Sequence, residues 1–402
     1  MNPPKPSLAS LIIIGMILGL GVGFFVGPSA ASLGVVGKVY IDLIKMMAVP
    51  LVFLTIVDAI ISTAISWRHA GRWAFVIVCN SVCALVIGLT LSNIFRPGQG
   101  FPLSLASSGQ AVSADLGAPS LAAVLNAIVP NTIVAPFAEN NVISVVFLAL
   151  LIGAAVRRYV QQAQGSAVQV QRMTDGLLAV WKIALMWLVH LVPVAVFCVT
   201  AKTVGEHGFS PFANLAKYVG IGFLGLSLQI LLVYPLWIRI IGNIPLAHFV
   251  QVARRPVAYA FGTNSSLATL PLTLEALDEL KVSKSASRLG ACIGTNFNND
   301  GILLYEAMAV LFVAQVYGMD LSLGQQIVAA LMSLVAAVGV AGVPEAGVVS
   351  LSLVLTAVGL PLEIVPLLLT VDWIVARMRS VTNVLSDMTV SVAISGGVRD
   401  SR

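Results

Sequence analysis

Long apolar stretches, separated by short polar segments, run through the first 242 residues of the chain. A helix needs roughly 20 apolar residues to cross a bilayer, and most of these stretches are at least that long. Their pattern predicts six helices, over residues 8–30, 36–66, 72–95, 142–157, 176–204 and 211–242. The segment 97–141 between the third and fourth of these is rich in Ser, Ala, Gly and Pro. We expect it to be an extracellular connection.

After residue 245 the apolar stretches are interrupted by two short segments that a continuous membrane helix would not contain. These segments are GTNSSLATLP at 262–271 and GVAGVPEAG at 339–347. Broken backbone is tolerated at membrane depth only where it is buried in protein or lines a wet cavity. Because apolar residues flank each segment, we expect two pairs of half-helices that turn back at a tip inside the membrane. The alternative is two ordinary loops outside the membrane.

The last apolar stretch carries charged residues, in the sequence VDWIVARMRSVTNVLSD at 371–387. A helix advances about 100° per residue, which places five residues on one face: Asp372, Ala376, Arg379, Asn383 and Asp387. Arg377 points away from this face. A charge inside a membrane needs a partner, and the guanidinium fork of Arg379 is suited to a substrate carboxylate. The alternative is an internal ion pair of Arg379 with Asp372 or Asp387.

A second polar cluster lies inside the apolar sequence GTNFNNDGILLYEAM at 294–308. Its centre is formed by Asn298, Asn299, Asp300 and Gly301, and we expect Gly301 to weaken the helix and release backbone carbonyls. Carbonyl and carboxylate oxygens are the ligands that a small hard cation prefers. Asp300 and Asp387 are therefore candidate ligands of a cation.

The composition excludes most other classes of protein. The chain has 402 residues, of which 58% are apolar and 10% are charged, and its mean hydropathy is +0.97; soluble domains are far more polar. No basic cluster is interleaved with aromatic residues, so the net charge of +5 does not indicate a nucleic-acid partner. The positive-inside bias places both termini in the cytoplasm. The His and Cys residues are scattered and form no motif with catalytic spacing, which argues against an enzyme.

Five segments occur in the order of known family signatures: KMMAVPLVF, NSSLATLP, NNDGILLYEAMAVLFVAQ, GVPEAG and VDWIVARMRSVTNVLSD. Over essentially its whole length the chain resembles the glutamate transporter family of dicarboxylate and amino-acid cation symporters. The resemblance implies an all-α membrane protein with eight transmembrane helices and two re-entrant helical hairpins, built from inverted repeats. It also implies a homotrimer in the lipid bilayer of the inner membrane.

The resemblance further implies an elevator mechanism, in which a transport domain slides against a scaffold. The scaffold would comprise residues 1–70, with helices 1 and 2, and residues 99–206, with the extracellular connection and helices 4 and 5. The transport domain would comprise residues 71–98, with helix 3, and residues 207–402, from helix 6 through both hairpins to helix 8.

The same resemblance implies roles for individual residues. The substrate would be bound by Arg379, Asn383, Ser265, Ser266, Ser380, Asp372, Gly342 and Val343. Sodium would be bound by Gly294, Asn298, Asn383 and Asp387, with Asp300 and Ser81 as further candidates. Glu306 stands at the position of the proton carrier of the animal members, and its alternative role is structural. Na⁺ and H⁺ are thus both possible coupling ions.

The chain departs from the family pattern around these ion sites. Where the family usually reads Asn-Met-Asp-Gly-Thr, this chain has Asn299 and Ile302 in place of the Met and the Thr. A thioether sodium ligand and a substrate-facing hydroxyl are therefore missing. A Tyr and a Thr of the third helix correspond to Ile77 and Asn80. We expect the number of sodium ions carried to differ from the family pattern.

Ala376 stands where the amino-acid-carrying members have an Asp that accepts the substrate's ammonium group. A buried ammonium group without an acceptor is strongly disfavoured, and dicarboxylate-carrying members also lack this Asp. We therefore expect a symporter that imports a small anionic metabolite, a C4-type dicarboxylate, with Na⁺ and/or H⁺. The alternatives are an amino-acid symporter of the same family and an uncoupled uniporter or anion channel.

Overall fold

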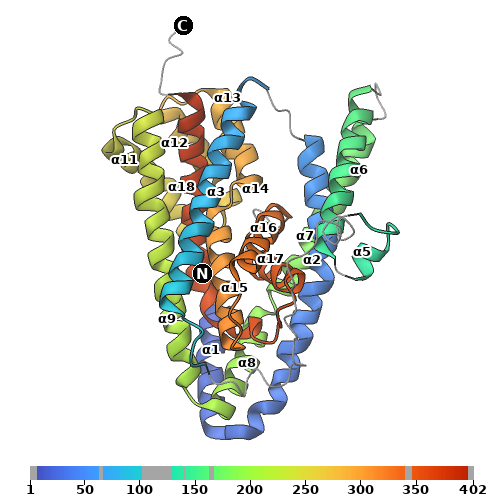
Figure 1. Cartoon of the computed structure of the whole chain (residues 1–402), viewed down its shortest axis with the longest axis vertical. Helices are drawn as coiled ribbons and strands as arrows, with labels where there is room; N and C mark the ends of the chain where they lie inside the picture. Colours follow the sequence, from blue (N-terminus) through green and yellow to red (C-terminus); the bar gives the residue numbers. More distant parts are fainter. Residues whose placement is uncertain are drawn as a thin grey trace, which may run out of the picture.

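The computed structural model describes residues 7–62, 67–101, 129–139, 141–162, 167–339 and 346–396 (Figure 1). Helices connected by short turns make up these ranges, which contain no β-strand. The prediction of an all-α chain is confirmed for them. Two of the expected substrate-binding residues, Gly342 and Val343, lie outside the described residues. Most of the segment 97–141 also lies outside them.

The helices of the first half follow the predicted order, with different ends. They are α1 (Leu8–Val26), α2 (Gly34–Ser62), α3 (Trp67–Phe95), the short α5 (Ala135–Ala138), α6 (Val142–Gln162), α7 (Ala167–Val189), α8 (Val192–His207) and α9 (Ser210–Leu228). The predicted helix 8–30 ends early, because a 3-10 turn covers Gly27–Leu33. The prediction of one helix over 176–204 is wrong, because the chain breaks between α7 and α8. Pro193 lies in the first turn of α8, where its missing N–H costs nothing.

The helix predicted over 211–242 is present but changes its geometry along the way. After α9 the chain widens into a π-helical stretch (Gln229–Val233), returns to α10 (Tyr234–Leu236) and widens again over Trp237–Ile241. π-helical insertions rotate the following residues and are frequent at functional sites. Here they turn Gln229 and Tyr234 toward the second half of the chain.

The second half contains the two interrupted segments. Its helices are α11 (Leu246–Thr263), α12 (Ser266–Glu279), α13 (Lys284–Ser287), α14 (Gly294–Phe297), α15 (Asp300–Val316), α16 (Leu323–Gly339), α17 (Ala346–Ala357) and α18 (Val365–Ser395). A π-helical stretch, Arg288–Ile293, joins α13 to α14. The first interrupted segment forms a tight helical hairpin, because Asn264 adopts the left-handed conformation at φ 53° and Ser265 caps α12. Residues 340–345 of the second interrupted segment lie outside the described ranges.

The chain contains helices that are long and apolar enough to cross a membrane. In the described ranges there are four such segments, Leu8–Asp58, Gly71–Phe95, Gln169–His207 and Ser210–Ile241. The first of them contains α1 and most of α2. This finding supports a multi-pass membrane protein, whereas the expected number of eight spans stays a prediction.

Helices α1 and α8 pack with their backbones in close contact. Three glycines spaced by four residues on α1, Gly15, Gly19 and Gly23, face the backbone of α8. A Cβ atom at Gly19 would lie 2.6 Å from the carbonyl oxygen of Phe197. Small residues at this spacing are the usual means by which membrane helices approach closely. The pair thereby braces α8 along the side of α2.

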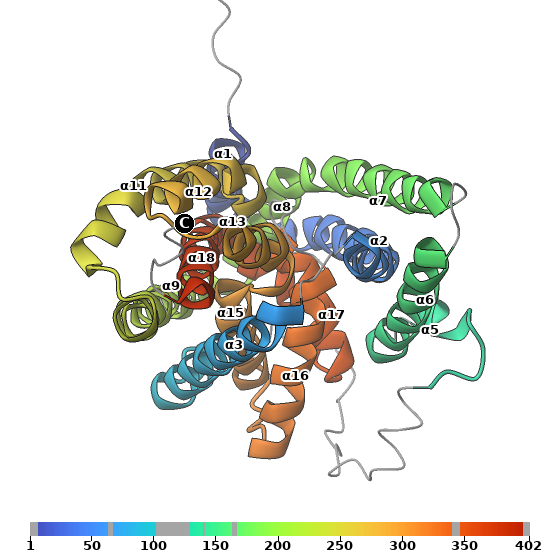
Figure 2. The same cartoon turned by 90° about the horizontal axis from the view of Figure 1, so that it is seen from above.

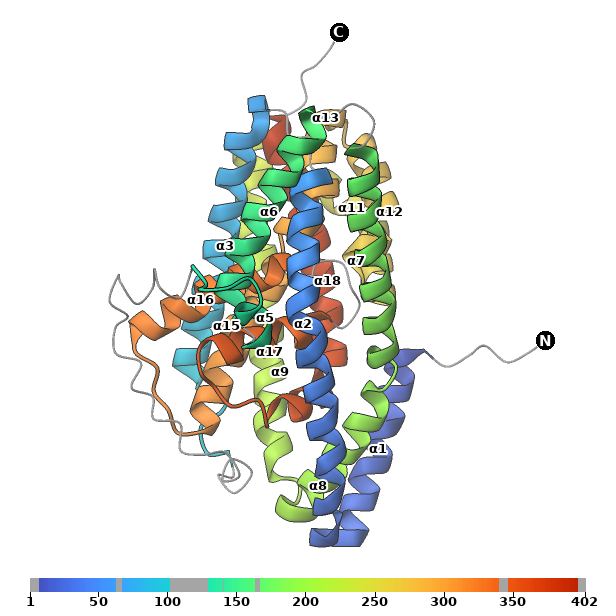
Figure 3. The ribbon, with the colours of Figure 1, turned by 90° about the vertical axis from the view of Figure 1, so that its right-hand side faces the viewer.

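Helix α18 lies at the centre of the second half and is buried along nearly its whole length. It contacts α9, α11, α12 and α15, and Figure 2 shows it between these helices, with α2, α6 and α7 on the other side of the molecule. Figure 3 shows α2 on that side with α7 beside its upper part and α8 beside its lower part. Polar residues on α18 are therefore enclosed by protein.

Candidate functional site

Arg379 and Asp372 form a buried ion pair on α18. The Nη1 and Nη2 atoms of Arg379 donate to the two carboxylate oxygens of Asp372 at 2.7 and 3.1 Å. The two residues are only 4% and 1% exposed. A seven-residue separation places them two helical turns apart on the same face of α18. The internal pairing that the sequence left open for Arg379 is therefore made with Asp372, and Asp387 bonds elsewhere.

Two other helices enclose the guanidinium group of Arg379. Its Cζ atom lies 4.1 Å from the ring centroid of Tyr305 on α15, which is a cation–π contact. Gly347 at the start of α17 lies against the same group, because a Cβ atom there would come within 2.5 Å of Nη2. Any larger residue at position 347 would displace the guanidinium group. Arg379 is thus held between α15, α17 and its own helix.

Arg377 points away from this site, as the helical spacing predicts, and binds the tip of the first hairpin. Its Nη1 atom donates to the carbonyl oxygens of Phe261 and Gly262 at 2.6 and 3.0 Å. These carbonyls belong to the last turn of α11, where backbone acceptors lack helical partners and a positive charge is favourable. Ser380 donates to the Asn264 side chain at 3.0 Å. The hairpin tip is therefore held to α18 at two points.

The serines expected to bind substrate lie at this hairpin tip. Ser265 and Ser266 are buried, and the Ser265 hydroxyl accepts a hydrogen bond from the Ala268 N–H at 3.1 Å as the cap of α12. Ser380 faces the same tip through Asn264. The structure thus places three expected substrate ligands on the hairpin side of α18. Their roles toward a substrate stay predictions.

The helix break in the polar cluster lies at Asn298 and Asn299, and not at Gly301 as the sequence suggests. Both asparagines leave the helical conformation between α14 and α15, with ψ angles of 69° and 51°. Gly301 is helical and instead permits close packing, because a Cβ atom there would lie 2.6 Å from the Arg379 carbonyl oxygen. Its N–H donates to Asn383 Oδ1 at 2.9 Å. The Asn383 amide in turn donates to Asn299 at 3.3 Å.

Asp387 lies on the other side of this break, and its described polar contacts are with neutral groups. Its carboxylate accepts hydrogen bonds from Thr295 Oγ1 at 3.0 Å and from Asn298 Nδ2 at 3.2 Å. Gly294 lies beside it, since a Cβ atom there would be 3.0 Å from Asp387 Oδ1. The Oδ1 atom of Asn298 is buried without a hydrogen-bond partner. Three of the expected sodium ligands, Gly294, Asn298 and Asp387, are therefore brought together.

Asp300 lies at the centre of a separate group of polar residues. Its Oδ2 atom accepts hydrogen bonds from Ser386 at 2.5 Å, Tyr234 at 3.1 Å and Gln229 at 3.4 Å. Asn80 on α3 donates to Ser386 at 3.3 Å and joins the same group. Four oxygen atoms here are buried without a hydrogen-bond partner: Asn80 Oδ1, Ser81 Oγ, Gln229 Oε1 and Asp300 Oδ1.

Sequence reasoning missed Gln229, Tyr234 and Ser386 as members of the Asp300 group. Gln229 and Tyr234 are polar residues in an otherwise apolar stretch of helix, which is a signal for a buried polar contact in a membrane protein. Their partner lies 66 or more residues away in sequence. Thr295 beside Asp387 and Tyr305 beside Arg379 were missed in the same way. Each lies within two residues of a residue that the sequence did single out.

Glu306 is fully buried on α15, one turn beyond Ile302. Ser350 on α17 donates a hydrogen bond to its carboxylate. The contact joins α15 to the helix that also places Gly347 against Arg379. This geometry is compatible with both roles expected for Glu306, the proton carrier and the structural residue.

Chemically, the clusters on α18 combine an anion-binding group with oxygen ligands for a hard cation. Arg379 supplies a bidentate donor for a carboxylate, and the Asp387 and Asp300 groups supply carboxylate, amide and hydroxyl oxygens. Within the described ranges no three His, Cys, Asp or Glu side chains gather as a metal site. The unpartnered oxygen of Asn298 and the four around Asp300 are buried oxygen atoms of the kind that a hard cation prefers.

Comparisons with known proteins agree with these features. A model of the sodium:dicarboxylate symporter family matches residues 8–396. A C4-dicarboxylate transport protein of Rhodospirillum rubrum is 30% identical over 392 residues, which cover 96% of this chain and 87% of that protein. C4-dicarboxylate transport protein 1 of Mesorhizobium japonicum is 29% identical, over 96% of this chain and 81% of its own length. The Paracoccus denitrificans C4-dicarboxylate transport protein is 27% identical, over 98% and 88%.

Proposed function

Because the chain belongs to the sodium:dicarboxylate symporter family, we propose that it imports a C4-type dicarboxylate together with a cation. The family consists of transporters, so the chain is a multi-pass membrane transport protein and not an enzyme. The relatives named above carry C4-dicarboxylate transport in their names, which supports this substrate class.

The environment of Arg379 is the main support for this proposal. The guanidinium group is buried against Tyr305 and Gly347, and the carboxylate of Asp372 accepts two hydrogen bonds from it. Ala376 is 2% exposed on the same face, between Asp372 and Arg379. A methyl group there offers no acceptor to an ammonium group. The face therefore favours a substrate that has carboxylates and no amine.

Asp372 has a defined part in this proposal. Its carboxylate already occupies Arg379 in the geometry that a substrate carboxylate would use, with two parallel N–H···O bonds. We infer that a substrate carboxylate either takes over these donors or shares the guanidinium group with Asp372. Asp372 thereby orients the guanidinium group of Arg379 before the substrate arrives. The negative charge of Asp372 also compensates the buried positive charge of Arg379.

The coupling ion is assigned to the Asp387 group. Its carboxylate is 2% exposed and forms no ion pair with a described residue. A buried carboxylate with only neutral donors is costly, and a co-transported sodium ion held by Asp387, Asn298 and Gly294 would remove this cost. The Asp300 group with Ser81 is the second candidate for such a cargo ion, and Glu306 is the candidate for a carried proton.

We further propose the architecture that the resemblance implies. The scaffold comprises residues 1–70 and 99–206, and the elevator-like transport domain comprises residues 71–98 and 207–402. In this proposal the protein has eight transmembrane helices with re-entrant hairpins built around α11–α12 and α16–α17, and it forms a homotrimer. Both termini face the cytoplasm, and the protein resides in the inner membrane.

Substrate uptake into proteoliposomes tests the proposal. We expect labelled succinate to accumulate when an inward sodium or proton gradient is imposed, and unlabelled fumarate to compete better than aspartate or serine. If aspartate competes better than fumarate, the amino-acid alternative replaces the dicarboxylate. If neither gradient drives accumulation, the protein is an uncoupled uniporter or channel and the coupling assignment of Asp387 is wrong.

A further inference from the structure

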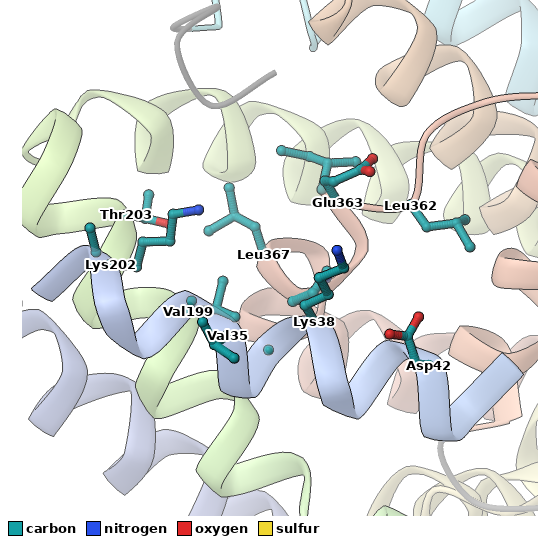
Figure 4. Close-up of a pocket in the computed structure, with 14 residues that line it drawn as sticks. Val35, Lys38, Asp42, Val199, Lys202, Thr203, Leu362, Glu363 and Leu367 are labelled. Atoms are coloured by element: carbon teal, nitrogen blue, oxygen red, sulfur yellow. The ribbon is translucent and has the colours of Figure 1, made fainter. Parts of the chain in front are cut away.

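A cavity of about 330 Å³ lies between three segments of the chain and is lined by none of the residues around Arg379 or Asp387 (Figure 4). Its walls are residues 34–42 at the start of α2, residues 199–203 of α8 and residues 362–367 leading into α18. Its volume falls in the range of small-molecule sites, about 300 to 1,000 Å³. The transport site proposed above therefore does not account for it.

Charged side chains reach the cavity from all three walls. Figure 4 shows Lys202 and Thr203 of α8 at one end, Asp42 of α2 at the other, and Lys38 below Glu363 between them. At the Lys202 end an ammonium group thus lies beside the Thr203 hydroxyl group, and the carboxylates of Glu363 and Asp42 lie farther along the cavity. Such a gradient of charge favours a ligand that has an anionic and a cationic group close together.

The two lysines are positioned to meet an anion. Within the described part of the chain neither Lys38 nor Lys202 forms an ion pair. The Lys202 stem crosses directly over Gly34, because a Cβ atom there would lie 2.5 Å from Lys202 Cδ. Both lysines belong to segments that are apolar enough to cross a membrane. An ammonium group at such a place is expected to have an anionic partner.

The acidic side of the cavity is also held in place. Tyr317, the residue that follows α15, donates a hydrogen bond to Glu363 Oε2 at 3.4 Å. This contact fixes one carboxylate oxygen and keeps the acid at the cavity wall. A primary ammonium group has three N–H donors that such a carboxylate accepts, whereas a trimethylated one has none.

The rim of the cavity is apolar. Val35, Val36 and Val39 on α2 are 65%, 40% and 52% exposed, and Val35 also lines the cavity itself. An apolar surface beside a charged pocket in a membrane protein suits an acyl chain next to a headgroup. A free polar metabolite without an acyl chain would not contact this apolar surface.

We propose that this cavity binds the headgroup of a zwitterionic membrane phospholipid, with the phosphate between Lys38 and Lys202 and a primary ammonium group at Glu363. The ligand class is phosphatidylethanolamine. In the proposed architecture two walls belong to the scaffold and the third to the transport domain. A lipid bridging them would stabilise this arrangement and slow the sliding of one domain past the other. That last step rests on the proposed function, whereas the binding itself does not.

Lipid binding by the purified chain in detergent tests the site without any substrate. Phosphatidylethanolamine, phosphatidylcholine and phosphatidylglycerol of one acyl composition are titrated, and binding is followed by native mass spectrometry and by the rise in Tm. Phosphatidylethanolamine should bind most tightly of the three lipids. The double variant Lys38→Gln with Lys202→Gln should bind this lipid about tenfold more weakly, because two charge-assisted contacts are lost. Glu363→Gln should reduce the preference over phosphatidylcholine. Lys217→Gln, a lysine of α9 outside the cavity, is the matched control and should change nothing.

Several results would overturn the assignment. One is equal binding of the three lipids, and another is unchanged binding by the double lysine variant at an unchanged lipid-free Tm. A third is full competition by glycerophosphoethanolamine, which would make the ligand a soluble zwitterion. In vesicles rich in phosphatidylethanolamine the double variant should also take up succinate about twofold faster than the wild type, because the lipid no longer links the two domains through partly exposed charges. Loss of uptake in the double variant alone would contradict the slowing role of the lipid, whereas absence of uptake in the wild type would count against the proposed function and leave the lipid-binding result standing.

Discussion

Two carboxylates on one face of α18 are equally buried, but one has a charged partner and the other has neutral hydrogen-bond donors. Asp372 is 1% exposed and is paired with Arg379, whereas Asp387 is 2% exposed and receives its hydrogen bonds from the described residues Thr295 and Asn298. Removing an ion from water costs several kcal/mol unless a partner compensates the charge. The protein provides that partner for Asp372 and does not provide one for Asp387 among its described residues.

In the proposed function, the two ends of the helix bind different cargoes. At Asp372 the protein holds its own cation, so an arriving anion has a guanidinium group to bind. At Asp387 it holds an anion, so an arriving cation has a carboxylate to bind. A bound cation neutralises the Asp387 carboxylate and so removes a negative charge that would repel a dicarboxylate on the same helix, which explains in physical terms why a dicarboxylate and a cation would travel together.

Removing Arg379 should have the largest effect on this comparison. Arg379→Ala loses both bonds to a substrate carboxylate and leaves Asp372 buried without a cation. We expect succinate binding to weaken at least about a hundredfold, and the free energy of unfolding to fall by about 3–5 kcal/mol. Calorimetry and thermal unfolding in detergent measure the two effects.

The double variant Arg379→Ala with Asp372→Asn separates these effects. It should recover most of the lost stability, because neither charge of this ion pair remains, and it should still fail to bind succinate. A single variant as stable as the wild type would show that Asp372 is not the buried charge partner. A double variant that binds succinate normally would show that Arg379 is not the anchor.

Neutralising each carboxylate in turn tests their different surroundings directly. Asp372→Asn leaves Arg379 buried without its partner and should cost about 3 kcal/mol of stability. Asp387→Asn removes a charge that has no partner, so its cost in sodium-free buffer should stay below about 1 kcal/mol. Thermal unfolding of both variants without sodium decides the point. Equal destabilisation would remove the basis of the comparison.

Ala376 tests the nature of the anion. The wild type should bind succinate at least about tenfold more tightly than aspartate, because an ammonium group would be buried without an acceptor at a cost of about 1–3 kcal/mol or more. Ala376→Asp should narrow or reverse this preference, and Ala376→Ser is the matched control for added volume. If the wild type prefers aspartate, Asp372 or Ser380 supplies the acceptor and the dicarboxylate assignment falls.

Arg377 provides the smallest effect, on the outer side of the same helix. Arg377→Gln loses the charge-assisted contacts to the Phe261 and Gly262 carbonyls, which together hold the hairpin tip. The reporter is a cysteine at position 266, in a chain whose four native cysteines are replaced. Arg377→Gln should make this cysteine react about threefold faster with a polar thiol reagent than it does when Arg377 is present, because the lost contacts are worth about 0.5–1 kcal/mol at a partly exposed site. Arg377→Lys keeps the charge and should lie between. Unchanged labelling would show that Arg377 does not hold the tip.

Much of this site follows from helical spacing in the sequence. The 100° rule placed Asp372, Ala376, Arg379 and Asp387 on one face and Arg377 on another, and all five lie as expected. Polar or Gly-containing interruptions of apolar sequence also marked the turn at Asn264 between α11 and α12, whereas the place of this turn inside the membrane stays a prediction. These features are local, so that one segment of sequence contains all the information needed.

The remaining features depend on contacts between distant segments or on small changes of helix geometry. The choice of Asp372 over Asp387 as the partner of Arg379 depends on rotamers and on the packing of Tyr305 and Gly347. The widening of α9 into a π-helix at Gln229 shifts the register by one residue, and no sequence periodicity shows it. The break at Asn298 and Asn299 was expected at Gly301, because glycine is the weaker helix former. At position 301 the backbone of Arg379 comes so close that a glycine is required, although this residue lies within a helix.

The most direct test of the central claim is the linkage between sodium and succinate at Asp387. Succinate is titrated calorimetrically into the purified protein at low and at high sodium, with choline replacing sodium, for the wild type and for Asp387→Asn. We expect sodium to tighten succinate binding to the wild type at least about tenfold, a coupling of about 1.4 kcal/mol, and Asp387→Asn to bind succinate with the same affinity at both sodium concentrations. A sodium dependence that survives in Asp387→Asn, or wild-type binding that ignores sodium and responds to pH instead, would contradict the claim.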